Sequence, residues 1–266
     1  MKPSIITLLT DFGSQDYFVG AMKGVILSIN PAAQIVDLTH EIPPQDIHAA
    51  AFNLLASYRS FPPQTIHVAV VDPGVGSARR PLLIESGEQF FVGPDNGIFS
   101  WICERGENCR ARHLTNQEFF RHPVSATFHG RDVFAPVAAA LSNGLSPEKF
   151  GPSVADLVRL ESLEPKVAEE FTEASIIHID RFGNCITNLT RDNIGEEPGL
   201  VKLVINRREV TAFRKFFAEH SEGDHELFCL IGSAGFLEIA ARNASAAEVL
   251  DARPGQKVTL FAGVAR

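Results

Sequence analysis

Two acidic residues follow apolar, strand-like runs in the first third of the chain. Asp11 comes after the run at residues 4–9, and Asp72 comes after the run at residues 66–71. In an open parallel sheet, ligands bind outside the carboxyl ends of the strands, where the strand order reverses. Both residues are therefore candidates for a ligand site, although Asp is also a common turn former and helix cap.

The segment that follows the second of these runs contains glycine without the spacing of a phosphate-binding loop. It reads DPGVGSAR over residues 72–79, whereas a P-loop requires GxxxxGK followed by Ser or Thr. No GxGxxG follows a strand-like run. The sequence therefore disfavours the binding of nucleoside triphosphates and dinucleotides.

Three other segments could face a cleft. FHGRD at residues 128–132 precedes an Ala-rich helical run, so His129 stands at the mouth of a helix, although a single His is more often an ordinary surface or core residue. DRFGN at residues 180–184 joins two β-like runs and has the spacing of an ordinary hairpin loop. GSAG at residues 232–235 is a glycine-rich turn.

The elements that must position these residues alternate between strand and helix in the first part of the chain. Strand-like runs lie at residues 4–9, 34–38, 66–71, 82–85 and 90–92, and helical patterns lie at 18–29, 47–58 and 130–141. The order β-α-β-α-β is the minimum for a doubly wound sheet. We predict an α/β N-terminal domain over residues 1–160 with a mainly parallel central sheet.

The rest of the chain has a different pattern. Residues 161–172 are charged and lack periodicity, so we predict a linker there. Short β-like runs follow at residues 175–179, 185–189, 200–205, 227–231 and 257–261, with turn residues between them. We predict a smaller, mostly antiparallel β domain over residues 173–266.

Composition limits the partners. The 32 acidic residues outnumber the 24 Lys and Arg residues, and no basic block is present, so we expect no nucleic acid partner. No apolar stretch approaches the ~20 residues that span a bilayer, and the N-terminal pattern does not match a signal peptide. We expect no membrane partner and a cytoplasmic location. The four cysteines, Cys103, Cys109, Cys185 and Cys229, have no zinc or redox spacing; we predict buried free thiols, and neither a metal nor a cofactor.

Taken together, the motifs resemble one family. They are TDFG at 10–13, DPGVG at 72–76, GPDNG at 93–97, FHGRD at 128–132, DRFGN at 180–184, GSAG at 232–235 and ARN at 241–243. In this order they resemble the S-adenosylmethionine (SAM) hydrolases, or SAM hydroxide adenosyltransferases, which are related to fluorinases and chlorinases. The resemblance covers nearly the whole chain. It implies an enzyme that cleaves SAM to adenosine and methionine by attack of water at the 5′ carbon.

The resemblance implies that Asp72, Arg79 and His129 hold the water or hydroxide. A sulfonium is an excellent leaving group and needs no general acid, so the reaction depends on an aligned and activated nucleophile. Arg79 stays protonated and cannot be the base. Either Asp72 or His129 must accept the proton, and the sequence leaves this choice open.

The resemblance also assigns substrate contacts. It places Asp11 against the ribose hydroxyls, which suits a carboxylate that accepts two hydrogen bonds. The other matched positions are Phe128 in the FHGRD motif, Phe182 and Asn184 for the nucleoside, Asp180 for the methionine amine, Ser233 for the methionine carboxylate, and Phe217, Asn243 and Ala244 for adenine. Family members are trimers with sites between neighbouring subunits, so a homotrimer is expected here.

Other readings of the sequence remain. Fluorinases carry Tyr at the position of Asp72, Ser near that of Gly130 and Arg at that of Ala234. A carboxylate at position 72 would repel an incoming halide by ~1–4 kcal/mol at ~4 Å, which disfavours a SAM-dependent halogenase. A non-catalytic adenosine or SAM sensor would have no need of the three water-handling residues. An α/β protein without a small-molecule site would leave the carboxylates at the strand ends unexplained.

Overall fold

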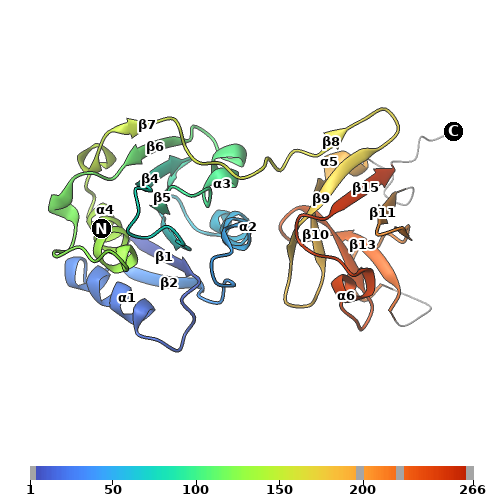
Figure 1. Cartoon of the computed structure of the whole chain (residues 1–266), viewed down its shortest axis with the longest axis horizontal. Coiled ribbons are helices and arrows are strands. Elements are labelled where there is room, and N and C mark those ends of the chain that lie inside the picture. The colour runs from blue at the N-terminus through green and yellow to red at the C-terminus, as the bar shows by residue number, and fades with distance from the viewer. Residues whose placement is uncertain (1–3, 196–200, 220–224, 262–266) are drawn as a thin grey trace. The chain divides into compact units, whose positions relative to one another are not determined.

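The computed structural model describes residues 4–195, 201–219 and 225–261. The chain divides into two compact units, residues 1–162 and 163–266 (Figure 1). No helix among the described residues is both long and apolar enough to cross a membrane.

The first unit is built on a seven-stranded sheet with the order β2-β1-β3-β5-β4-β6-β7. The strands are β1 (Ile5–Thr10), β2 (Gln34–Thr39), β3 (Ile66–Val70), β4 (Pro81–Ser86), β5 (Gln89–Pro94), β6 (Arg110–His113) and β7 (Ser153–Val154). Strands β2, β1, β3 and β5 are mutually parallel, whereas β4, β6 and β7 pair antiparallel. The α/β class is confirmed, and the sheet is mixed because the short connection between β4 and β5 forces them to run antiparallel.

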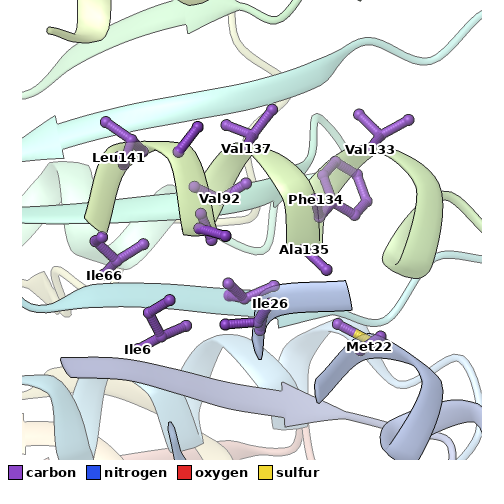
Figure 2. Close-up of a cluster of buried hydrophobic side chains, with 14 of the residues drawn as sticks. Ile6, Met22, Ile26, Ile66, Val92, Val133, Phe134, Ala135, Val137 and Leu141 are labelled. Atoms are coloured by element: carbon purple, nitrogen blue, oxygen red, sulfur yellow. The ribbon is translucent and has the colours of Figure 1, made fainter. Parts of the chain in front are cut away.

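Helices cover both faces of this sheet. Helices α1 (Phe18–Ile29) and α4 (Ala135–Ser142) pack with Ile6 and Leu8 in one hydrophobic cluster (Figure 2). Helices α2 (Ile47–Ser57) and α3 (Ser100–Arg105) pack with Leu9 in another. Because successive strand residues point to opposite faces, β1 supplies both clusters.

Strand order reverses at β1. From β1 the chain crosses through α1 to β2 on one side, and from β2 it returns through α2 to β3 on the other side. Ile6 is paired with Ile66 and Thr10 with Val70, so β1 and β3 end at the same edge. Asp11 and Asp72 therefore both lie at the switch point where α/β sheets bind ligands.

The helix predicted at residues 130–141 has two parts. Residues Gly130–Phe134 form a π-helical turn, and α4 continues from Ala135. Such π turns are frequent at functional sites. Three short 3-10 segments complete the first unit, at Tyr58–Ser60, Gln117–Phe119 and Pro147–Phe150.

Over its described residues, the second unit is an antiparallel β structure with two short helices, α5 (Arg191–Ile194) and α6 (Ala246–Leu250). Its strands are β8 (Lys166–Val167), β9 (Thr172–Ile179), β10 (Cys185–Thr190), β11 (Lys202–Ile205), β12 (Arg208–Val210), β13 (Leu227–Ile231), β14 (Phe236–Ala241) and β15 (Lys257–Phe261). The order is β12-β11-β15-β9-β10-β14-β13, with β8 on β9. Strand β8 lies inside the predicted linker at residues 161–172, and the start of the run predicted at residues 200–205 lies outside the described residues.

The prediction of four free thiols is wrong for one pair. Cys103 and Cys109 form a disulfide, whereas Cys185 and Cys229 are free and buried. The spacing of Cys103 and Cys109 fits no short motif, so the sequence did not predict their disulfide. Helix α3 ends at Arg105 and β6 begins at Arg110, and this reversal brings the two Cα atoms to 5.2 Å, within the range that a disulfide spans.

Candidate active site

A cavity of about 420 Å³ opens at the switch point of the first unit. Its wall combines the segment after β1 with Gln45, the segment after β3, and residues 127–130. This volume lies in the ~300–1,000 Å³ range of sites for small ligands. Of the residues predicted from the sequence, Asp11, Asp72, Phe128 and His129 line this cavity.

Arg79 joins Asp72 to His129. Its Nε donates to both carboxylate oxygens of Asp72, at 2.9 and 3.0 Å, and its Nη2 also donates to Asp72 Oδ2. The same Nη2 lies 2.7 Å from His129 Nδ1. The side chains of Arg79 and Asp72 are only 9% and 5% exposed. The structure thus brings the three predicted water-handling residues into one buried network.

The network fixes the protonation of the histidine. Burial, and next the charge of Arg79, lower the pKa of His129 and favour the neutral imidazole. Because a guanidinium can only donate, Nδ1 must accept, and the ring hydrogen therefore resides on Nε2. Arg79 Nη1 is buried without a hydrogen-bond partner among the described residues.

Glycine allows the two loops that carry this network to meet. Gly76 has φ +78°, and a Cβ at this position would overlap the carbonyl oxygen of Ala126. Residues 72–79 can therefore lie directly against the loop that leads to His129. Any other residue at position 76 would push the loops apart and separate Arg79 from His129.

Asp132 anchors the loop that ends at His129, and the sequence reasoning missed this role. Its carboxylate is fully buried and accepts from Arg131 Nε at 2.7 Å, from Arg121 Nη1 at 3.1 Å and from Ser125 N at 2.9 Å. Burial opposes the charge, yet these donors hold the pKa of Asp132 below its usual value. The FHGRD motif places Asp132 directly after Arg131, and this adjacent pair of opposite charges could have indicated the role.

Asp11 is held by Gln45, which the sequence did not single out. The backbone N–H of Gln45 donates to Asp11 Oδ2 at 2.8 Å. Gln45 itself has φ +66°, a left-handed conformation that is uncommon for residues other than glycine and clusters at functional sites. This hydrogen bond uses only part of the carboxylate, so Asp11 can still accept hydrogen bonds from a ligand in the cavity.

In the second unit, Asp180 organises the loop between β9 and β10. Its Oδ1 accepts from the backbone N–H groups of Phe182 and Asn184, both at 2.9 Å, and its Oδ2 accepts from Asn184 Nδ2 at 2.8 Å. Three of the predicted binding residues therefore belong to one hairpin loop. Phe182, at the tip of this loop, is 78% exposed.

The remaining predicted residues lie on turns of the same unit. Ser233 is exposed in the turn between β13 and β14, where Gly232 N donates to Phe236 O. Phe217 is 53% exposed, with its ring centroid 6.3 Å from that of Phe228. Asn243 is exposed with φ +51°, and Ala244 forms a bridge with Ala241 after β14. Their contacts with substrate remain predictions.

Glu238 on β14 is a further residue that the sequence reasoning missed. Its carboxyl group packs so closely under Gly232 that a Cβ there would overlap it. Burial, followed by the negative charge of Asp180, raises the pKa of Glu238 to about 7. No short motif marks this residue, because its environment comes from the fold of two separate turns.

Comparison with known proteins identifies relatives over nearly the whole chain. The family models for the SAM hydroxide adenosyltransferase N-terminal and C-terminal domains match residues 6–151 and 174–259. The chain is 38% identical to the (R)-S-adenosyl-L-methionine hydrolase of Methanocaldococcus jannaschii, over 93% of this chain and 92% of that protein. It is 39% identical to the protein of the same name from Thermus thermophilus, over 98% and 100%.

More distant relatives and a solved structure extend the comparison. The fluorinase of Nocardia brasiliensis is 26% identical, over 97% of both chains. The crystal structure of an uncharacterized conserved protein from Thermotoga maritima superposes with a TM-score of 0.89 at 35% identity, over 96% of this chain and 99% of that one. Both domains and nearly the full length are thus matched, and the chain belongs to the SAM hydroxide adenosyltransferase family.

Proposed function

We propose that this protein hydrolyses SAM to adenosine and L-methionine by in-line attack of water at C5′. The observation that carries the proposal is the buried network of Asp72, Arg79 and His129 at the wall of the switch-point cavity. The names of the hydrolase relatives support it, and because those names specify the (R) configuration at sulfur, we propose the (R) epimer as substrate.

The hydrogen bonds favour Asp72 as the proton acceptor. Since Arg79 occupies His129 Nδ1, the imidazole can offer only its Nε2–H to an incoming oxygen. In the step we propose, the water oxygen bonds to C5′ while the C5′–S bond breaks. The bonding electron pair leaves on sulfur, which becomes the neutral thioether of methionine, and the proton passes to Asp72. His129 Nε2–H would donate to the oxygen, because His129 lines the cavity and its Nδ1 is occupied by Arg79.

Substrate contacts follow from the same proposal. Asp11 would accept from the ribose hydroxyls through the capacity that Gln45 N leaves free. Phe128 would contact the substrate beside His129, because both residues line the cavity. We propose Asp180, Phe182, Asn184, Phe217, Ser233, Asn243 and Ala244 as the contacts from the second unit, on the basis of their place in the family motifs.

The deciding experiment is hydrolysis in ¹⁸O-labelled water. Attack at carbon places the label on the 5′ oxygen of adenosine, which mass spectrometry detects, and none enters methionine. Unlabelled adenosine, or no turnover of either SAM epimer, would refute the proposal. Binding without turnover would instead indicate a sensor.

A SAM-dependent halogenase is the alternative that the fluorinase relatives raise. The carboxylate of Asp72 would lie beside the incoming halide, and at ~4 Å two like charges repel by ~1–4 kcal/mol. Neutral water avoids this repulsion. Supplying chloride or fluoride should therefore yield adenosine and no 5′-halogenated nucleoside.

We further propose a homotrimer in which neighbouring subunits share each site, and a cytoplasmic location. The proposed contacts divide between the two units, with His129 in the first and Asn184 in the second. If subunits share sites, His129→Ala and Asn184→Ala chains that are mixed and reassembled should recover part of the activity. A monomer by light scattering, or mixed assemblies without recovery, would contradict the shared site.

A further inference from the structure

Three phenylalanines form a continuous aromatic wall in the cavity of the first unit. Phe12 follows β1, Phe18 begins α1, and Phe128 precedes the π-helical turn. All three line the cavity. Their ring centroids lie 5.7 Å (Phe12 to Phe18), 5.9 Å (Phe12 to Phe128) and 5.3 Å (Phe18 to Phe128) apart. The rings therefore support one another as a single surface.

The three rings differ in their partners. Phe128 already carries a cation, because the Arg131 guanidinium lies 5.0 Å from its centroid. No Lys or Arg within residues 4–195, 201–219 or 225–261 lies over the ring of Phe12 or Phe18. Aromatic faces attract cations within ~6 Å, more strongly where water is excluded. Phe12 and Phe18 line the cavity without such a cation, and Tyr17 packs on Phe18 with ring centroids 4.6 Å apart.

The proposed reaction brings a cation into this cavity. In-line displacement requires the leaving sulfur to lie on the side of C5′ opposite the water. The water is held by Asp72 and His129, so the sulfonium faces away from them. The cavity wall that does not belong to β3, to the segment after β3 or to residues 127–130 consists of Asp11, Phe12, Phe18 and Gln45.

We infer that Phe12 and Phe18 recognise the sulfonium charge of the substrate and so select SAM over uncharged thioethers of the same shape. The inference rests on the proposed function and assigns a specificity role to two residues that are not among the substrate contacts named above, one of which, Phe12, lies in the TDFG motif. It also has a consequence for turnover. Cleavage converts the sulfonium into a neutral thioether, so the attraction to the wall disappears as the products form, which favours their release.

Adenine stacking is the rival role for these rings, and the two roles predict different ligand preferences. Stacking would strengthen the binding of every ligand that contains adenosine. Charge recognition would strengthen the binding of SAM and of an analogue with an ammonium in place of the sulfonium. It would not strengthen the binding of S-adenosylhomocysteine or adenosine, which are uncharged at this position. Phe→Leu replacement keeps an apolar side chain and removes the aromatic face, so it separates the two roles.

The test compares Phe12→Leu and Phe18→Leu with Phe119→Leu. Phe119 is half-buried in the same hydrophobic cluster, 4.7 Å from Phe150 by ring centroids, and does not line the cavity. Dissociation constants for SAM, the ammonium analogue, S-adenosylhomocysteine and adenosine are measured by calorimetry, all in an Asp72→Asn background that slows turnover. Circular dichroism checks the fold of each variant.

We expect Phe12→Leu and Phe18→Leu to weaken binding of the two cations by about 2- to 30-fold. Binding of S-adenosylhomocysteine and adenosine should stay unchanged, and Phe119→Leu should change none of the four. Equal losses for charged and neutral ligands would overturn the aromatic-wall inference and leave the proposed function standing. Failure of the unsubstituted chain to bind or cleave SAM would overturn both.

Discussion

The two units hold their candidate residues in opposite ways. In the first unit, Asp72 and Arg79 have side chains 5% and 9% exposed, and Arg79 is hydrogen-bonded to both Asp72 and His129. In the second unit, Phe182 and Phe217 are 78% and 53% exposed. Buried, mutually bonded groups are already oriented before a ligand arrives, which suits chemistry. Exposed rings on turns suit recognition, because they lose water contact only when a ligand binds.

The buried titratable groups of the two units differ as well. In the first unit, burial lowers the pKa of His67 to about 4. In the second, burial and Asp180 raise the pKa of Glu238 to about 7. Both environments favour the neutral form, but one group is a base and the other an acid. The two units should therefore respond to pH with opposite signs.

The largest expected effect comes from the network of the first unit. Asp72→Asn keeps the shape of the side chain and removes the proton acceptor, so kcat for SAM hydrolysis should fall about 10²- to 10⁴-fold with little change in SAM affinity. His129→Ala should cost less, because the imidazole only donates in the proposed geometry. Single-turnover kinetics and calorimetry measure the two quantities.

Asp95 offers a matched control, because its partner Arg80 directly follows Arg79 in the chain. Asp95 is also buried and pairs with an arginine, accepting from Arg80 Nε at 2.8 Å, but it does not line the cavity. Asp95→Asn should lower stability and leave kcat nearly unchanged. If Asp95→Asn and Asp72→Asn reduced kcat equally, the effect would reflect folding and the assignment of Asp72 would be wrong.

Sequence patterns predicted the frame of the first unit well, for a physical reason. Helical and strand periodicities are local, and α1 begins at Phe18 and ends at Ile29 as the pattern indicates. The order of elements then limits the topology to a doubly wound sheet, which places Asp11 and Asp72 at one edge. The hydrogen bonds from Arg79 could not be derived in this way, and only the family resemblance suggested them.

The features that the sequence missed depend on how loops and turns fold, whether over the six positions between Cys103 and Cys109 or over longer stretches of chain. The Cys103–Cys109 disulfide needs a reversal between α3 and β6. Gln45 reaches Asp11 across 34 positions of the chain. Glu238 owes its pKa to burial and to Asp180, on a different loop. No periodicity or short motif encodes such environments, because they arise only when strands pair.

The second expected effect concerns acid stability of the first unit. His67 is fully buried between Thr7 and Gln89, with its ring stacked 4.9 Å from Phe91. Its pKa falls from 6.5 to about 4 on folding, so the unfolded state binds more protons between these values. Stability is therefore complete above pH 6.5 and declines toward pH 4, by about 3 kcal/mol.

Trp101 makes this prediction measurable. It is the only tryptophan of the chain and is buried in the first unit. Urea unfolding followed by its fluorescence should show the decline in the native protein, and His67→Gln should flatten the curve between pH 4 and 6.5. Parallel curves for the two proteins would show that His67 does not set the acid response.

The third effect has the opposite sign and belongs to the second unit. The pKa of Glu238 rises from 4.5 to about 7 on folding, so stability is fully present below pH 4.5 and is lost as pH rises through 7. Because the carboxyl group is only partly buried, we expect about 1–2 kcal/mol. Glu238→Gln should remove this slope in amide hydrogen exchange of β10 and β14. Glu209→Gln, on the exposed face of β12, is the control and should retain it.

The smallest expected effect concerns substrate binding by the exposed aromatic residues of the second unit. Phe182 contacts little within its own unit, so Phe182→Ala should leave the free energy of unfolding unchanged. If its ring packs against the nucleoside, SAM affinity should fall by about 1 kcal/mol, or roughly fivefold. Phe216 is a suitable control, because it is 56% exposed and has no proposed contact. Equal losses of affinity from Phe182→Ala and Phe216→Ala, measured by calorimetry, would mean that exposed aromatic surface acts nonspecifically. A loss confined to Phe182→Ala, with stability unchanged, would place the ring at the substrate and confirm that the second unit contributes recognition from its surface.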